Sequence, residues 1–199
     1  MINKRMMAGA AAAGMALAGA ASAQTTTRNE PRPTGMDKMF AMKATQVGIA
    51  EIKTSQLAVQ KTHNMRVMAV AKRMIKEHTA ANEELKTVAQ DKRMTLPSDT
   101  DPKHKAALRK LSRLSGTAFD KAYMAGQEKD HAATIKLFQN EIATGQDKDV
   151  TAFASKNLPN IQDHTRMIFQ VGSSLGVHST MMPKLKPAMM PSSMNGKNM

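Results

Sequence analysis

Four residues of types that commonly bind metal ions occupy comparable positions on four helical segments of the sequence. Glu51, His78, His131 and His164 each fall on an otherwise apolar stripe whose members recur every three or four positions. Such a stripe faces the interior of a helical protein, where an ionisable side chain without a partner costs several kcal/mol. A metal ion would satisfy all four side chains. Three neutral imidazoles and a carboxylate suit a divalent ion of iron, zinc, copper or manganese, and imidazole ligation favours the first three.

The helical rise places these four residues at similar depth. Turns are expected near positions 63 and 145, between the first and second and between the third and fourth long helices. At 1.5 Å per residue, Glu51 and His78 lie roughly 18 and 22 Å from the first turn. His131 and His164 lie roughly 21 and 28 Å from the second. All four therefore fall near mid-height in a bundle roughly 40 Å tall, which is where helical bundles build metal sites.

Acidic residues beside the histidines are candidates to support them. Glu128 stands three positions before His131, so both side chains can face one site, and Glu128 is a further candidate ligand. Glu77, Asp130 and Asp163 each directly precede a histidine, about 100° round the helix, and are expected to orient neighbouring histidines. The alternative is a buried hydrogen-bonded network, without an ion, that only fixes the register of the helices.

Four long amphipathic helices carry these residues, which predicts an all-α four-helix bundle. The composition agrees, because strong helix formers dominate and the chain has five Phe, one Tyr and no Trp. Pro159, inside the fourth long helix, should kink it or make it restart after Leu158. A short extra helix is expected in the connection between the second and third long helices, over 102–114. The long helices are expected over 36–61, 64–92, from about 117 to 144, and 147–171.

The N-terminus is typical of a cleaved secretory signal peptide. Lys4 and Arg5 precede a small apolar run over 6–20, and Ala21-Ser22-Ala23 has the pattern of a cleavage site. The apolar run is shorter than the roughly 20 residues needed to span a bilayer, and no later stretch approaches that length. The sequence therefore predicts a periplasmic or secreted protein that is cleaved near Ala23 and has no transmembrane segment afterwards.

The remaining chain divides into a leader, a folded domain and a tail. Residues 24–35 are polar and contain proline, which predicts a flexible leader, and residues 36–172 form the folded domain. Residues 173–199 contain Pro, Ser, Lys and Met and are expected to be a disordered Met-rich tail. Thioether sulfur selects Cu(I), so copper binding by His178 and the tail methionines is one alternative function. The absence of cysteine excludes disulfides, thiolate metal sites and a lipid-modified cysteine.

The charge balance is strongly basic, with a formal net charge of +13. Without residues 1–23 the chain keeps 27 Lys and Arg against 16 Asp and Glu. This excess favours contact with anionic envelope surfaces, such as lipid headgroups or polysaccharide, by a protein that is not a catalyst. Sequence-specific nucleic-acid binding is not expected, because the charges are spread and lack an aromatic platform. No hydrolase motif or phosphate-binding glycine loop occurs, so the prediction leans away from an enzyme.

Several segments together resemble a bacterial family catalogued as domain of unknown function 4142, whose members are typically exported. The resemblance covers about residues 36–172 and is carried by EIKTSQLAVQ, VMAVAKRMIKEHTAANEEL, LPSDTD, LSRLSGTAFDKAYMAGQEKDHAATIKLF and FASKNLPNIQDHTRM. It implies a ferritin-like fold, with an up-down-down-up bundle and a crossover between the second and third long helices. It implies no reaction.

The chain departs from the di-iron members of the wider ferritin-like group. Those proteins use a Glu-x-x-His pair on each of two helices, and here only Glu128 and His131 form one. Ile75 and Ile161 stand three positions before the other two histidines. A mononuclear site, or an inherited site without an ion, is therefore expected. The leading hypothesis is an exported bundle that binds a metal ion for metal handling or stress protection.

Overall fold

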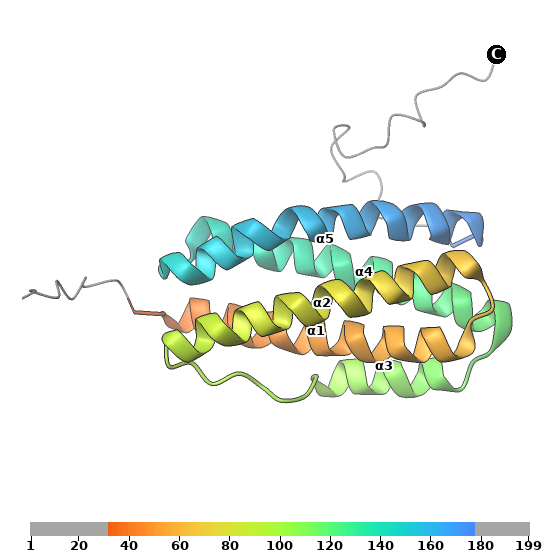
Figure 1. Ribbon diagram of the computed structural model, residues 1–199, viewed down its shortest axis with the longest axis horizontal. Coiled ribbons are helices and arrows are strands. Elements are labelled where there is room, and N and C mark those ends of the chain that lie inside the picture. The colour runs from red at the N-terminus through yellow and green to blue at the C-terminus, as the bar shows by residue number, and fades with distance from the viewer. Residues whose placement is uncertain (1–31, 178–199) are drawn as a thin grey trace, which may run out of the picture.

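The computed structural model describes residues 32–177, which form four long helices and one short one (Figure 1). The predicted signal peptide, most of the leader, and residues 178–199 of the Met-rich tail lie outside these residues. The predicted start of the tail at position 173 is too early, because the last helix continues to Ser174. Within the described part, no helix is long and apolar enough to cross a membrane. The helices are α1 (Gly35–Lys61), α2 (Met65–Asp91), the short α3 (Pro102–Ser112), α4 (Gly116–Thr144) and α5 (Lys148–Ser174).

Short polar side chains start four of the five helices. Thr34 and Asp37 form a capping box at α1, in which each side chain accepts from the backbone N–H of the other residue. Asn64, Asp101 and Asp147 accept backbone N–H groups of the first turn of α2, α3 and α5. These caps lie within one or two residues of the helix starts predicted from the sequence.

The long helices pack as two antiparallel hairpins, α1 with α2 and α4 with α5, and α1 also lies against α4 and α2 against α5. Residues 92–101 and α3 return the chain along α1, as Figure 1 shows. The hydroxyl of Thr100 donates to the backbone oxygen of Gln46 at 2.9 Å, and Nζ of Lys61 donates to that of Leu114 at 2.7 Å. This crossover makes α2 and α4 run in the same direction. The ferritin-like up-down-down-up order is confirmed.

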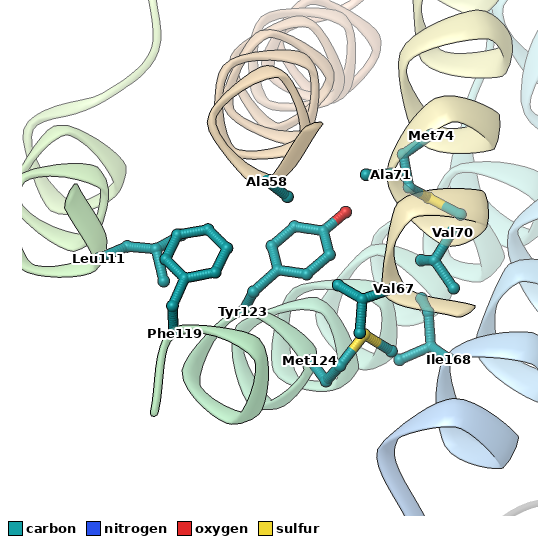
Figure 2. Packing of buried hydrophobic residues seen from close by; sticks show 10 residues of the cluster. All are labelled: Ala58, Val67, Val70, Ala71, Met74, Leu111, Phe119, Tyr123, Met124 and Ile168. Atoms are coloured by element: carbon teal, nitrogen blue, oxygen red, sulfur yellow. The ribbon is translucent and has the colours of Figure 1, made fainter. Parts of the chain in front are cut away.

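The interior contains two apolar clusters with a polar layer between them. One cluster surrounds Phe119 and Tyr123 near the start of α4 and is drawn in Figure 2, with Met74, Met124 and Ile168 packed against it. The other lies at the opposite end, where three phenylalanine rings pack with centroids 5.0–6.3 Å apart: Phe40, Phe138 and Phe153. The polar layer between the clusters contains the buried histidines.

Two details of the helices differ from expectation. The helix α5 runs without interruption through Pro159, so the restart after Leu158 does not occur. In the last turns of α4 an apolar side chain faces the solvent, since Ile142 is 39% exposed. Glu141 is buried in its place, because the helix turns the preceding residue toward the acidic cap residues Asp37 and Asp147.

Candidate metal centre

Three histidines from three helices meet in the polar layer. His78 of α2, His131 of α4 and His164 of α5 are 9%, 2% and 2% exposed. One ring nitrogen from each lies within 4.8 Å of the other two. The ring centroids are 5.4–5.6 Å apart, and Nε2 of His131 stands 3.4 Å from Nδ1 of His164. The predicted convergence of these three side chains is therefore present, and the group could hold a metal ion.

Hydrogen bonds to the outer nitrogens orient two of the rings. Nδ1 of His131 donates to the backbone oxygen of Gln127 at 3.0 Å, and Nε2 of His164 donates to Oε2 of Glu77 at 2.6 Å. A neutral imidazole has one N–H and one lone pair, so the inner nitrogens of both rings present lone pairs. Nε2 of His78 is buried and has no hydrogen-bond partner among residues 32–177. Two of the three rings therefore turn lone pairs toward the centre, and the third places an unpartnered nitrogen in the same layer.

Burial keeps these imidazoles neutral. Desolvation, together with repulsion from the other two rings, lowers the pKa of His78 well below 6.5. Desolvation likewise lowers the pKa of His131 to about 3, and His164 adds to the effect. Desolvation also lowers the pKa of His164, although the carboxylate of Glu77 opposes it. Neutral imidazole is the form that binds metal ions, and the folded chain presents these three rings in that form at neutral pH.

The carboxylate of Glu77 is held by arginine. Nε of Arg73 lies 2.8 Å from Oε1 of Glu77, and its terminal nitrogen lies 2.6 Å from Asp163, which also binds Arg166 at 2.7 Å. Burial raises the pKa of Glu77, but the hydrogen bonds from Arg73 and His164 outweigh it and lower the pKa overall. Glu77 is therefore ionised and fixes the His164 ring. The sequence predicted Glu77 as a support, and it serves a histidine on a different helix from its own.

Replacing the Glu77 carboxylate tests this support. We expect Glu77→Gln to weaken binding of a divalent ion by roughly 10- to 100-fold, because an amide orients the ring without adding to its basicity. Isothermal titration with Zn(II) measures the change. The matched control is Glu83→Gln, an exposed position on the same helix, which should leave the affinity unchanged. Equal affinities for the two variants would show that Glu77 does not act on the centre.

Glu51 lies next to the histidines on the outer side of one ring. Its carboxyl group is 2% exposed, and Oε1 is 3.9 Å from Nδ1 of His131, the nitrogen that faces away from the other two rings. Burial, and then the charge of Asp130, raise the pKa of Glu51 to about 8, against a hydrogen bond from Gln127. Within the described residues, the group that could hold an ion contains the histidines alone. A ligand role for Glu51 stays a prediction.

The other two acids near His131 face elsewhere. Glu128 is buried, and its Oε1 lies close to Gly172 of α5, 2.9 Å from the point that a Cβ on this glycine would occupy. Gly172 follows His164 by eight positions, which is roughly 12 Å along the helix, so Glu128 faces away from the histidines. Asp130 lies 3.6 Å from Nε2 of His104 on α3. Ligation by Glu128 stays a prediction, and Asp130 serves a histidine of the crossover.

His104 of α3 is a further histidine with little exposure to solvent. Its side chain is 12% exposed, because α3 packs on the bundle, and Nδ1 lies 2.6 Å from Asp101. The hydrogen bond to Asp130, reinforced by Asp101, raises the pKa of His104 to about 9 against its burial. The contact between His104 and Asp130 depends on how α3 docks on the bundle, so the sequence alone does not reveal it. The i, i+3 spacing of Asp101 and His104 was the one local signal.

Comparisons with known proteins agree with this fold. The sequence profile of the family described as "Domain of unknown function (DUF4142)" matches residues 6–171. No curated protein is similar enough to match the chain. A crystal structure of a DUF305 fragment from Deinococcus radiodurans superposes with a TM-score of 0.66 at 11% identity, covering 72% of this chain and 99% of that one. A "putative secreted protein DUF305" from Streptomyces coelicolor superposes with a TM-score of 0.62 at 13% identity, covering 73% and 97%.

Proposed function

The chain belongs to the DUF4142 family, and from its buried histidines we propose that it is an exported bundle that binds one divalent transition-metal ion. The proposed ligands are His78, His131 and His164. Iron, zinc and copper are favoured over manganese because all three ligand atoms are imidazole nitrogens. The proposed role is metal handling or stress protection, without catalysis by the chain itself.

One observation supports the proposal above the others. Nε2 of His131 and Nδ1 of His164 face each other at 3.4 Å while both outer nitrogens donate elsewhere. Two acceptor lone pairs at this distance cannot hydrogen-bond to each other, and desolvation disfavours a proton on either ring. Two nitrogens bound to one tetrahedral ion at 2.0–2.1 Å stand roughly 3.3–3.4 Å apart. A cation between the rings therefore fits both their separation and their hydrogen bonding.

A buried hydrogen-bonded network is the competing explanation for these histidines. Such a network needs a donor for each acceptor, because an unsatisfied buried polar atom costs roughly 1–3 kcal/mol. The two facing nitrogens, Nε2 of His131 and Nδ1 of His164, supply none, because the outer nitrogen of each ring carries the proton. This shortage of donors favours the metal site over a purely structural role.

The proposed location outside the cytoplasm rests on the N-terminus and on one structural neighbour. Residues 1–23 have the basic, apolar and small-residue regions of a signal peptide. The neighbour from Streptomyces coelicolor is described as "putative secreted". An exported protein meets metal ions that cytosolic buffering does not control, and a buried site without thiols suits that oxidising environment.

Metal content tests the proposal. The full chain, expressed with its native N-terminus and purified from the periplasm without chelators, should contain close to one equivalent of metal by elemental analysis. The His78→Ala/His164→Ala variant should contain almost none, because a single imidazole remains. The control is His63→Ala, an exposed histidine at the turn between α1 and α2, which should retain the wild-type content. Equal metal in the wild type and the double variant, with both folded by circular dichroism, would refute the proposal.

A further inference from the structure

A cavity adjoins the histidine centre on one side. It encloses about 40 Å³ and is lined by all four long helices. His78, His164 and Glu77 line the end of the cavity at the histidine centre. Phe138 and Phe153, which belong to the second apolar cluster, line its other end. The cavity therefore extends from two of the three proposed ligands into the second apolar cluster, along the bundle axis.

The size of the cavity limits what it can hold. A buried water needs roughly 10–15 Å³ measured in the same way, so about three heavy atoms fit. Most of the lining is apolar, and Ala81 on α2 leaves room beside the centre. Asn160 also lines the cavity and is exposed, so the opening lies at the α2/α5 edge.

Asparagine amides form part of the polar lining, beside the carboxylate and imidazole groups at one end. Asn82 follows His78 by four positions and Asn160 precedes His164 by four, so each lies one turn from a proposed ligand on the cavity side. Gly48 makes room for the first of these amides, since a Cβ at that position would collide with the Asn82 side chain. An amide N–H can donate to an anion, whereas the histidine lone pairs cannot.

We propose, on the basis of the proposed metal site, that the ion keeps one coordination position open toward this cavity and binds a small anion there. Three protein ligands leave a tetrahedral ion one position for water or an exogenous group. Three neutral imidazoles bring no charge to the ion, and the Glu77 carboxylate beside them is already paired with Arg73, so an anion of two or three heavy atoms is preferred. Asn82 and Asn160 lie on the cavity side of their histidines and donate to the bound anion.

Azide, a linear anion of three atoms, tests this inference on the full chain loaded with Co(II). Azide should change the visible d–d spectrum of the wild-type protein with a saturable dependence on its concentration. Ala81→Leu places a larger side chain in the cavity and should weaken azide at least tenfold while the Co(II) stoichiometry stays the same. Ala80→Leu, the same substitution at the adjacent exposed position, is the matched control and should behave as wild type.

The outcomes separate the two proposals. Absence of Co(II) binding by the wild type would refute the metal site and this inference together. Bound Co(II) without a spectral response to azide, or equal azide affinity in the two leucine variants, would overturn the open position alone. Should Ala81→Leu lose Co(II), Asn82→Leu fills the same cavity from the next position, and unchanged azide affinity in that variant would likewise overturn the inference.

Discussion

Saturating Zn(II) should raise the midpoint of thermal unfolding of the folded domain by roughly 10 °C. The three histidines converge only in the folded chain, so an ion that they bind stabilises the folded state over the unfolded one. At a free ion concentration a thousand times the dissociation constant, this stabilisation is about 4 kcal/mol. Each kcal/mol shifts the midpoint by roughly 2–4 °C in a domain of this size. Differential scanning calorimetry with and without Zn(II) measures the shift.

Two variants show whether the shift comes from the proposed centre. His78→Ala/His164→Ala should unfold at the same temperature with and without Zn(II), because a single imidazole remains at the centre. His63→Ala should keep the full shift, since that histidine is exposed and distant in sequence from the group. A shift of wild-type size in the double variant would place the stabilising ion elsewhere on the chain.

The second large effect is expected at Glu141→Gln, which should stabilise the fold at pH 8 and leave it nearly unchanged at pH 4.5. Glu141 of α4 is buried beside Asp37 of α1 and Asp147, the cap of α5, and Lys92 lies 3.0 Å from Asp147. Desolvation, a hydrogen bond to Asp37 and repulsion by both aspartates raise the pKa of Glu141 to about 7. The neutral acid donates to Asp37, and an amide can do the same.

The direction of the pH effect follows from that raised pKa. The unfolded state ionises Glu141 near pH 4.5, whereas the folded state retains the proton to about pH 7. The stability that the protonated group contributes is complete below pH 4.5 and is lost as the pH rises to 7. The amide does not titrate, so the variant should exceed the wild type by roughly 1–3 kcal/mol at pH 8.

Urea unfolding at pH 4.5 and pH 8 tests this expectation. Glu83→Gln removes the same charge from an exposed position and should show no such pH-dependent gain. If the difference in unfolding free energy between Glu141→Gln and the wild type is the same at both pH values, the pKa of Glu141 is not raised in the folded state.

The sequence predicted the helices and the three histidines well because both depend on local periodicity. A 3.6-residue repeat fixes which face of a helix is buried, and His78, His131 and His164 lie on that face in each of their helices. The height of each residue follows from the helical rise alone. The convergence of the histidines could therefore be predicted from their spacing in the sequence.

The rotation of each helix about its own axis was less predictable. The differences between the predicted and the observed side-chain positions arise from this rotation. A stripe is about 100° wide, so Glu51 is buried as expected and yet lies on the outer side of the His131 ring. Near the end of α4, a small rotation decides between adjacent residues: Glu141 is buried and Ile142 is exposed. Partners on other helices, such as Glu77 for His164, depend on which helices are neighbours. No periodicity within one helix contains that information.

The crossover that contains α3 has a consequence for the order in which the chain matures. It divides the bundle into an N-terminal hairpin that contains His78 and a C-terminal hairpin that contains His131 and His164. Neither hairpin alone contains all three imidazoles, so the proposed ion would be held by all three only after the two halves have docked. If the proposed site binds its ion, that ion would link the two hairpins, and the metal-loaded form would be restricted to chains whose assembly is complete.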